Sequence, residues 1–334
     1  MQFVYVLVSS DNDLYLEELW ASVFSLRRFH PEDTVRVLSD APTVKRILER
    51  PNLSSLITEV LLVDVPEHYS PKERSRQIKT TVRNIIDDPF LFIDSDTIIC
   101  ESLNGIEQLS YDISAVPDGH LPLAGHAFKK SVYDNVKRIF DEDVTDSAYW
   151  FNSGVMYVAD NDHTRDFYRR WNENWTYSTF QKGCSQDQPA LVKTDKEFGY
   201  MIQQMPDIYN CQVALSLKYY ADAAIIHFWH MDFIKDQSYS PFLDLSAYRE
   251  IRNNSGITSY VEDLITHCKS SFVSPTMPIG YNQIIFLFSP AGQAFSQLHQ
   301  ENSMWAKTLD WIAMKIIILS RGIRKIRRLV QIRS

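Results

Sequence analysis

The chain has 334 residues, of which 45% are hydrophobic and 23% charged, so it can bury a substantial core and is not intrinsically disordered. Its formal net charge of -8 divides unevenly: residues 302–334 carry eight basic and one acidic residue (+7), which leaves 26 basic and 41 acidic residues (-15) for the rest. The part of the chain before residue 302 is acidic and has no cluster of basic residues that could contact nucleic-acid phosphates, which excludes general nucleic-acid binding by that part.

Cysteine spacing and the beginning of the chain bear on its compartment. The four cysteines are dispersed, and no pair has the spacing of a zinc or redox motif. The first residues enter an apolar stretch without the basic region of a secretory signal, and no apolar run is long enough to span a bilayer. We therefore expect a cytoplasmic protein with reduced thiols.

The first hundred residues alternate between strand-like and helix-like segments. The continuous apolar runs at 3–8 and 90–93 predict buried strands, and we also expect strands at 34–38 and 59–65. Helical spacing predicts helices at 15–29, 43–49 and 71–86. This alternation indicates an α/β fold with a doubly wound, mostly parallel sheet that binds ligands at the carboxyl ends of its strands.

The remainder of the body is less regular. We expect strands at 153–158 and 224–228 and a helix at 164–175, whereas residues 239–300 show little periodicity. Four aromatic residues of that helix either form part of the core, which is the commoner role, or shape a binding cleft: Phe167, Tyr168, Trp171 and Trp175.

The triplet Asp94-Ser95-Asp96 directly follows the apolar run Phe90-Leu91-Phe92-Ile93. Two carboxylates one residue apart, at the end of a buried strand, can both reach a divalent cation and its bound phosphates. The bare pattern means little, because three other Asp-x-Asp triplets occur, beginning at residues 11, 141 and 160. Only the triplet at 94 directly follows four bulky apolar residues, so we predict its function from that context.

Three further motifs each have a structural and a functional interpretation. Phe151-Asn152-Ser153-Gly154 is either a turn with a bulge or a place where a ligand approaches the backbone closely. Asp187-Gln188-Pro189 caps a helix, lines a cleft, or does both. His227 ends an apolar run, where it is either a satisfied core residue or a metal ligand near the aspartates.

The aspartate triplet and the three further motifs, taken in this order along the chain, resemble glycosyltransferase family 8. This is the GT-A-fold family that includes glycogenin and the bacterial lipooligosaccharide galactosyltransferases. The resemblance covers residues 3–230. It implies a retaining transfer of a hexose from a UDP-sugar to a glycan or lipid-linked glycan, dependent on Mn²⁺ or Mg²⁺. Surface-polysaccharide or lipopolysaccharide assembly is the implied setting.

The resemblance also implies roles for individual residues. The metal ligands would be Asp94, Asp96 and His227, and the reaction centre would contain Asp187 and Gln188. The donor-binding residues would be Ser9, Tyr15, Lys79, Ser95, Asn152, Ser153 and Lys235. Lys235 is a departure, because the family often has Gly and then Lys-Pro-Trp after His-Phe, whereas this chain has Trp229-His230 and places its lysine later.

The last thirty residues change character. Apolar residues from Trp305 onwards share helical spacing and are followed by a cluster of arginines and lysines. We expect residues 305–334 to form a basic amphipathic helix on the inner face of an anionic membrane; packing against the acidic body is the alternative. The predicted division is 1–240 for the catalytic domain, 241–300 for an extension of that domain on the acceptor side, and 301–334 for the membrane-associating helix.

Two other functions are compatible with parts of the sequence. A sugar-phosphate nucleotidyltransferase has a related sheet, but no Gly-rich basic loop follows the first strand here. A membrane-tethered nucleotide-sugar or glycan-binding protein that has lost turnover is compatible with the altered segment after His230.

Overall fold

The computed structural model describes the chain except residues 110, 127, 231–239, 271–285, 301–303 and 332–334, and it contains two compact units. The first unit is Met1–Thr276 and the second is Met277–Ser334. Lys235 lies outside the described residues, as does the segment 231–239 around it.

A seven-stranded sheet forms the centre of the first unit, in the order β3-β2-β1-β4-β7-β6-β8. The pairs β1–β2, β1–β4, β2–β3 and β6–β8 are parallel, whereas β7 runs antiparallel to β4 and β6. Its strands are β1 (Gln2–Leu7), β2 (Thr34–Ser39), β3 (Glu59–Leu62), β4 (Phe90–Ile93), β6 (Ile113–Pro117), β7 (Phe151–Val158) and β8 (Ile202–Gln204). The prediction of an α/β fold with a mostly parallel sheet is confirmed.

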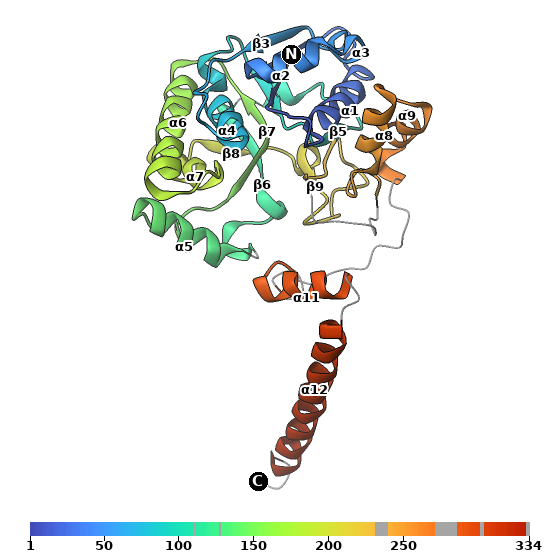
Figure 1. Cartoon of the computed structure of the whole chain (residues 1–334). Helices are drawn as coiled ribbons and strands as arrows, with labels where there is room; N and C mark the ends of the chain where they lie inside the picture. The colour runs from blue at the N-terminus through green and yellow to red at the C-terminus, as the bar shows by residue number, and fades with distance from the viewer. Residues whose placement is uncertain (110, 127, 231–239, 271–285, 301–303, 332–334) are drawn as a thin grey trace. The chain divides into compact units, whose positions relative to one another are not determined.

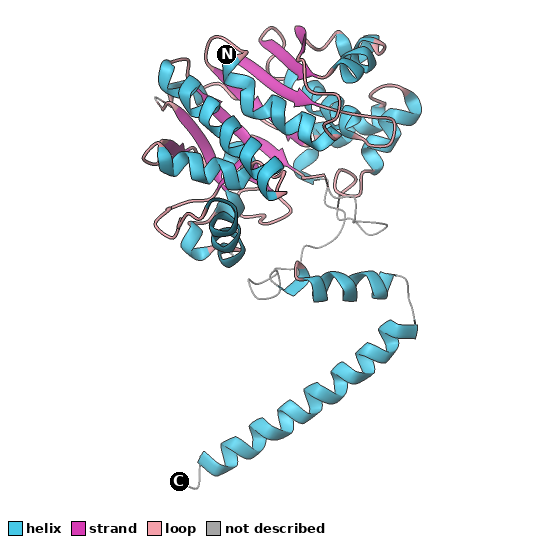
Figure 2. Cartoon of the chain, turned by 60° about the vertical axis from the view of Figure 1, so that its left-hand side comes forward, coloured by secondary structure: helices cyan, strands magenta, loops and turns pink. Residues whose placement is uncertain are grey.

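Helices cover both faces of this sheet, because alternate strand residues point to opposite sides. The odd residues of β1 (Phe3, Tyr5 and Leu7) pack in one core with α1, α8 and α9, and the even residues pack in another with α4, α6 and α7. Figures 1 and 2 show the strands between these two layers. The helices are α1 (Tyr15–Arg27), α4 (Pro71–Thr81), α6 (Asp162–Lys182), α7 (Gln188–Glu197), α8 (Ser246–Asn254) and α9 (Ser259–Thr266).

The helix boundaries follow local capping chemistry. Ser70 and Glu73 form a capping box at the start of α4, with Pro71 in the first turn. The predicted helix 71–86 ends earlier than expected, since α4 stops at Thr81 and a short 3₁₀ turn, Val82–Asn84, follows. Conversely, α6 is longer than predicted, because Asn161 caps its start and Gly183 ends it in a left-handed conformation.

A second, three-stranded sheet has the order β5-β10-β9, with β5 at Thr97–Ile99, β9 at Cys211–Gln212 and β10 at Ile225–His227. Strand β10 pairs antiparallel with β5, so that His227 lies opposite Thr97. Because Thr97 follows the aspartate triplet directly, this pairing carries His227 to the end of β4. Placing β10 here requires long-range contacts that no local pattern encodes.

The remaining helices of the first unit lie at its surface. They are α2 (Ala41–Leu48), α3 (Pro51–Ser54) and α5 (Lys129–Phe140). Asp40 caps α2, which begins two residues before the predicted helix 43–49. The region 239–300, which shows little periodicity, contains α8, α9 and α11 (Pro290–Gln300).

The second unit contains α11 and the long helix α12 (Met304–Gln331). The predicted helix at 305–334 is therefore present over most of its length. No helix among the described residues is both long and apolar enough to cross a membrane.

Candidate active site

The triplet Asp94-Ser95-Asp96 forms a partly exposed turn at the carboxyl end of β4. The Asp94 amide donates to the Gly154 carbonyl of β7 at 2.7 Å, and the Thr97 hydroxyl donates to the Asp94 carbonyl at 2.9 Å. These bonds hold the turn against two strands, so both carboxylates face the same region.

His227 completes a group of three possible metal ligands. One ligand atom each from Asp94, Asp96 and His227 lies within 4.8 Å of the other two. The imidazole Nε2 is 3.2 Å from Asp96 Oδ1, and the side chain is only 4% exposed. Two carboxylates and one imidazole suit Mg²⁺, Mn²⁺ or a similar divalent ion, so the residues present fit a metal of this class.

The three groups perturb one another. Burial raises the pKa of Asp94, and the nearby Lys79 cation only partly counteracts this. Burial also tends to raise the pKa of Asp96, but His227 and the hydrogen bonds to its carboxylate outweigh it and lower the value to about 2. Burial tends to lower the pKa of His227, whereas the Asp96 charge raises it and prevails. Clustered, perturbed groups of this kind are typical of functional sites.

A cationic pair on α4 borders the metal-ligand group. Lys79 Nζ lies 3.0 Å from Asp94 Oδ1 and 3.7 Å from Asp187 Oδ2. Arg76 Nε lies 3.1 Å from Asp187 Oδ1. No sequence motif points to Arg76, although its position three residues before Lys79 places both side chains on one face of the helix.

Asp187 precedes α7 but does not cap it, since its side chain makes no capping hydrogen bond. Its carboxylate instead accepts a 2.9 Å hydrogen bond from the Ser153 hydroxyl and pairs with Arg76 and Lys79. Burial tends to raise the pKa of Asp187, but the two cations outweigh it and lower the value to about 2. The interpretation of Asp187 as a helix cap is therefore wrong, and the carboxylate belongs to the charge cluster.

Strand β7 contains a bulge next to the candidate site. Its register against β6 shifts between Ala115 and Val116, opposite the segment that contains Ser153 and Gly154. A bulge of this kind re-aims side chains, as the sequence pattern allows. A Cβ added to Gly154 would lie 2.3 Å from His227 Cε1, so only glycine permits the imidazole to approach β7 this closely.

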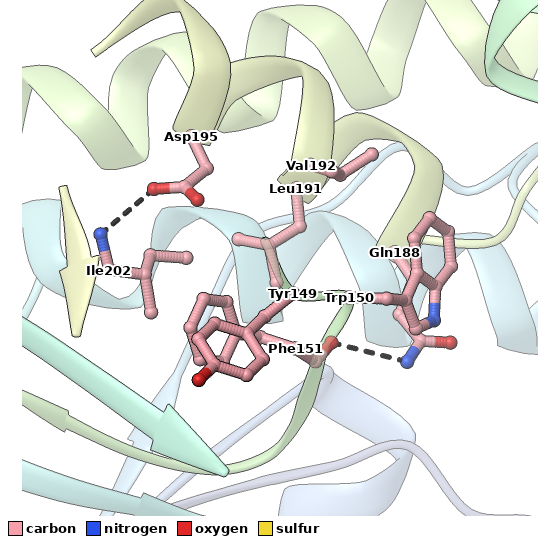
Figure 3. Close-up of a pocket in the computed structure, with 8 residues that line it drawn as sticks. All are labelled: Tyr149, Trp150, Phe151, Gln188, Leu191, Val192, Asp195 and Ile202. Carbon is pink, nitrogen blue, oxygen red and sulfur yellow. Dashed lines mark hydrogen bonds between the residues drawn. The ribbon is translucent and has the colours of Figure 1, made fainter. Parts of the chain in front are cut away.

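Gln188 begins α7 and lines a small crevice with Tyr149, Trp150, Leu191 and other residues (Figure 3). Its Nε2 donates to the Phe151 carbonyl at 3.4 Å. The bond ties the start of α7 to the start of β7, next to Asn152 and Ser153. Gln188 therefore lies beside Asp187 in the chain and beside the β7 residues in space.

A larger pocket of about 460 Å³, open to solvent, lies between the loop that follows β1 and helix α8. Its lining includes Tyr15, His230 and Arg249. Ser9 is close by, with its hydroxyl donating to Asp13 at 2.7 Å. The Tyr15 and His230 rings are 4.5 Å apart between centroids, and the His230 amide donates to Asp96 at 2.9 Å. His230, whose functional position the sequence does not indicate, connects this pocket to the metal-ligand group.

The two interpretations of the α6 aromatics are resolved. Phe167, Tyr168, Trp171 and Trp175 are at most 2% exposed and belong to the core beneath the sheet. The interpretation as cleft-shaping residues is wrong. Trp171 and Trp175 do, however, donate from their indole nitrogens to the Asp187 and Ser185 carbonyls, both at 3.2 Å, and so hold the segment before α7 in place.

No known family profile matches the chain, and no curated protein matches it. Among similar solved structures is the galactosyltransferase LgtC in complex with donor and acceptor sugar analogues (16% identity, 83% of this chain and 98% of that chain, TM-score 0.48). Mouse xyloside xylosyltransferase 1 is also similar (14% identity, 68% of this chain and 97% of that chain, TM-score 0.44). So is the glycosyltransferase GlyE of Streptococcus pneumoniae (14% identity, 83% of this chain and 66% of that chain, TM-score 0.46).

Proposed function

We propose that the chain is a glycosyltransferase that moves a hexose from a UDP-sugar to a glycan or lipid-linked glycan, with Mn²⁺ or Mg²⁺ as cofactor. The observation that carries the proposal is the juxtaposition of an Asp-Asp-His group with two cations. The group comprises Asp94, Asp96 and His227, and the cations are Arg76 and Lys79. A nucleoside diphosphate bound to a divalent ion needs both kinds of partner.

The metal would be held by the two aspartates and His227, and when bound it supplies positive charge next to a diphosphate. Departure of the diphosphate from the anomeric carbon leaves negative charge on the leaving oxygen. Lys79 and Arg76 are placed to stabilise that charge, because both already pair with carboxylates on the same side of the site. A donor phosphate would replace part of that pairing.

Asp187 and Gln188 have supporting roles in this proposal. Asp187 orients both cations, and Gln188 borders the sugar side through its contact with β7. Neither needs to act as a nucleophile if the leaving phosphate helps to deprotonate the acceptor hydroxyl on the same face. That route retains the anomeric configuration, and an inverted product would refute it.

Calorimetry of UDP binding with and without Mn²⁺, followed by a UDP-sugar hydrolysis screen, tests the proposal. We expect metal-dependent UDP binding and slow release of UDP from one UDP-sugar. Metal-dependent binding without turnover across a broad acceptor panel would favour the tethered binding protein instead. Absence of UDP binding under all conditions would remove both.

We further propose that α12 attaches the chain to an anionic membrane surface on the cytoplasmic side. Large apolar side chains on this helix are exposed, which is costly in water and favourable in the headgroup region: Trp305, Trp311, Met314, Ile316 and Ile318 are 56% to 69% exposed. The basic residues of the same segment match anionic lipid.

Cosedimentation with vesicles that contain phosphatidylserine tests the attachment. Truncation after Glu301 and the full-length variant Trp311→Glu should both reduce binding. Tyr260→Glu is the matched control, since Tyr260 is 54% exposed but belongs to α9 of the first unit. Unchanged binding of the truncated chain would contradict membrane attachment by α12.

A further inference from the structure

A continuous chain of buried side chains connects His227 to the interior of the first unit. His227 Nδ1 lies 3.0 Å from Asn210 Oδ1, and Asn210 Nδ2 donates to Asn152 Oδ1 at 3.0 Å. Asn152 Nδ2 in turn donates to Asp118 Oδ1 at 3.0 Å, and the other Asp118 oxygen is 3.1 Å from His126 Nε2. These five residues, here termed the amide relay, are each no more than 6% exposed.

Backbone groups fix the direction of every hydrogen bond in the amide relay. The Gly154 N–H can only donate, and it lies 2.9 Å from Asn152 Oδ1, so this atom is an acceptor. A flipped Asn152 would place its NH₂ against the Gly154 N–H and its oxygen against the Asp118 carboxylate. Asn152 therefore has one allowed orientation.

The orientation of Asn152 determines that of Asn210. Because Asn152 Oδ1 accepts, the Asn210 group that faces it must be the NH₂. Asn210 then presents its oxygen to His227, and that oxygen can only accept. The His227 Nδ1 must carry the proton, and the neutral ring has its lone pair on Nε2, the nitrogen that faces Asp96.

We propose that Asn210, held by Asn152, is a positioning residue that fixes His227 in the tautomer able to bind a divalent cation through Nε2. The proposal rests on the metal site proposed above. It adds a role for a residue outside the metal-ligand group and gives Asn152 a task other than donor contact. Outer hydrogen bonds to a metal-binding imidazole set its tautomer and ring orientation in this way.

The other end of the amide relay is anchored equally firmly. The Phe128 N–H donates to His126 Nδ1 at 3.1 Å, so His126 donates from Nε2 to Asp118. Asp118 thus accepts from both His126 and Asn152. Because Asp118 accepts at its end of the amide relay, the hydrogen bonds from His227 through Asn210 and Asn152 all donate in the direction of Asp118.

The test uses the variants Asn210→Ala and Asn210→Asp of the full-length chain. Nitrogen NMR at a pH where His227 is neutral reports the tautomer without metal, and the His227→Gln spectrum assigns its signal. We expect the Nδ1–H form in the wild type and in Asn210→Asp, which keeps an oxygen facing Nδ1. Asn210→Ala should lose this preference and bind Mn²⁺ roughly 10- to 100-fold more weakly in calorimetry.

Asn174→Ala is the control for loss of a buried amide. Asn174 is 6% exposed and donates to Thr194 and Glu197, away from the amide relay. It should lower the melting temperature yet leave Mn²⁺ affinity unchanged. Wild-type tautomer and affinity in Asn210→Ala would overturn the proposal, and if that variant does not fold, loss of the Nδ1–H form in Asn210→Asp would do so.

The two proposals fail in different ways. If the wild type binds no Mn²⁺, the metal site itself is refuted, whatever the tautomer. If the wild type binds Mn²⁺ and Asn210→Ala binds it equally well, only the positioning role is refuted.

Discussion

Lys79 Nζ lies 3.0 Å from Asp94 Oδ1, so the ammonium group directly contacts one of the three candidate metal ligands. The same ammonium group is 3.7 Å from Asp187, and its side chain is only 3% exposed. A buried cation next to a cation site works against metal binding by Coulomb repulsion, but it favours a phosphate. The position of Lys79 therefore supports the proposed site for a phosphate and a metal together.

This relationship predicts opposite effects of Lys79→Met on two ligands. At a pH where Asp94 is ionised, Mn²⁺ alone should bind as well as to the wild type or better, because a repulsive charge has been removed. UDP in the presence of Mn²⁺ should bind about 10- to 100-fold more weakly, the loss of one charge-assisted hydrogen bond. Calorimetry with each ligand separates the two effects, and equal losses for both would contradict the proposed phosphate contact.

The Asp96 carboxylate should be indispensable for the metal. Asp96→Ala removes a ligand and leaves His227 without its 3.2 Å partner, so Mn²⁺-dependent UDP binding should be abolished. Asp143→Ala is the matched control, because Asp143 belongs to another Asp-x-Asp triplet and its carboxylate is exposed, accepting from the Thr145 amide. Calorimetry that finds metal-dependent binding retained in Asp96→Ala would remove the Asp-Asp-His group from the mechanism.

Much of the sheet follows from local pattern, whereas the site follows only in part. The apolar run 90–93 predicts β4 to the residue, because a strand buried on both faces has a distinctive composition. Arg76 and Asn210 cannot be identified from local pattern, because their proposed roles depend on partners that are 111 and 17 residues away in the chain. For Asp187 the local pattern is misleading. Its position before a helix predicts a capping hydrogen bond, but its carboxylate instead contacts two cations and the Ser153 hydroxyl.

Gly154 should tolerate no side chain. Gly154→Ala places a Cβ 2.3 Å from His227 Cε1 and 2.9 Å from Asn152 Oδ1, so the imidazole must move away from Asp96. Mn²⁺ affinity should fall at least tenfold even under conditions where the variant remains folded. Gly125→Ala is the control, since its added Cβ meets nothing within 4 Å. A melting-temperature shift by Mn²⁺ that is the same in both variants would argue against this steric constraint.

Asp195 should make stability depend on pH independently of the metal site. Burial raises its pKa to about 7, although its carboxylate accepts a 2.8 Å hydrogen bond from the Ile202 amide (Figure 3). A carboxyl group whose pKa is higher in the folded than in the unfolded state stabilises the fold. This contribution is fully present at pH values below the pKa of the unfolded state, which is near 4. That contribution is lost as the pH rises to about 7 and changes little above it.

The variant Asp195→Asn removes this titration while keeping an oxygen that can accept from Ile202. The free energy of unfolding of the variant relative to the wild type should therefore increase between pH 4 and pH 7 and remain level above pH 7. Urea unfolding at several pH values measures the difference, and a difference that is constant with pH would show that Asp195 ionises normally in the fold. Asp143→Asn serves as the control, because an exposed carboxylate with a lowered pKa cannot produce a rise across this range.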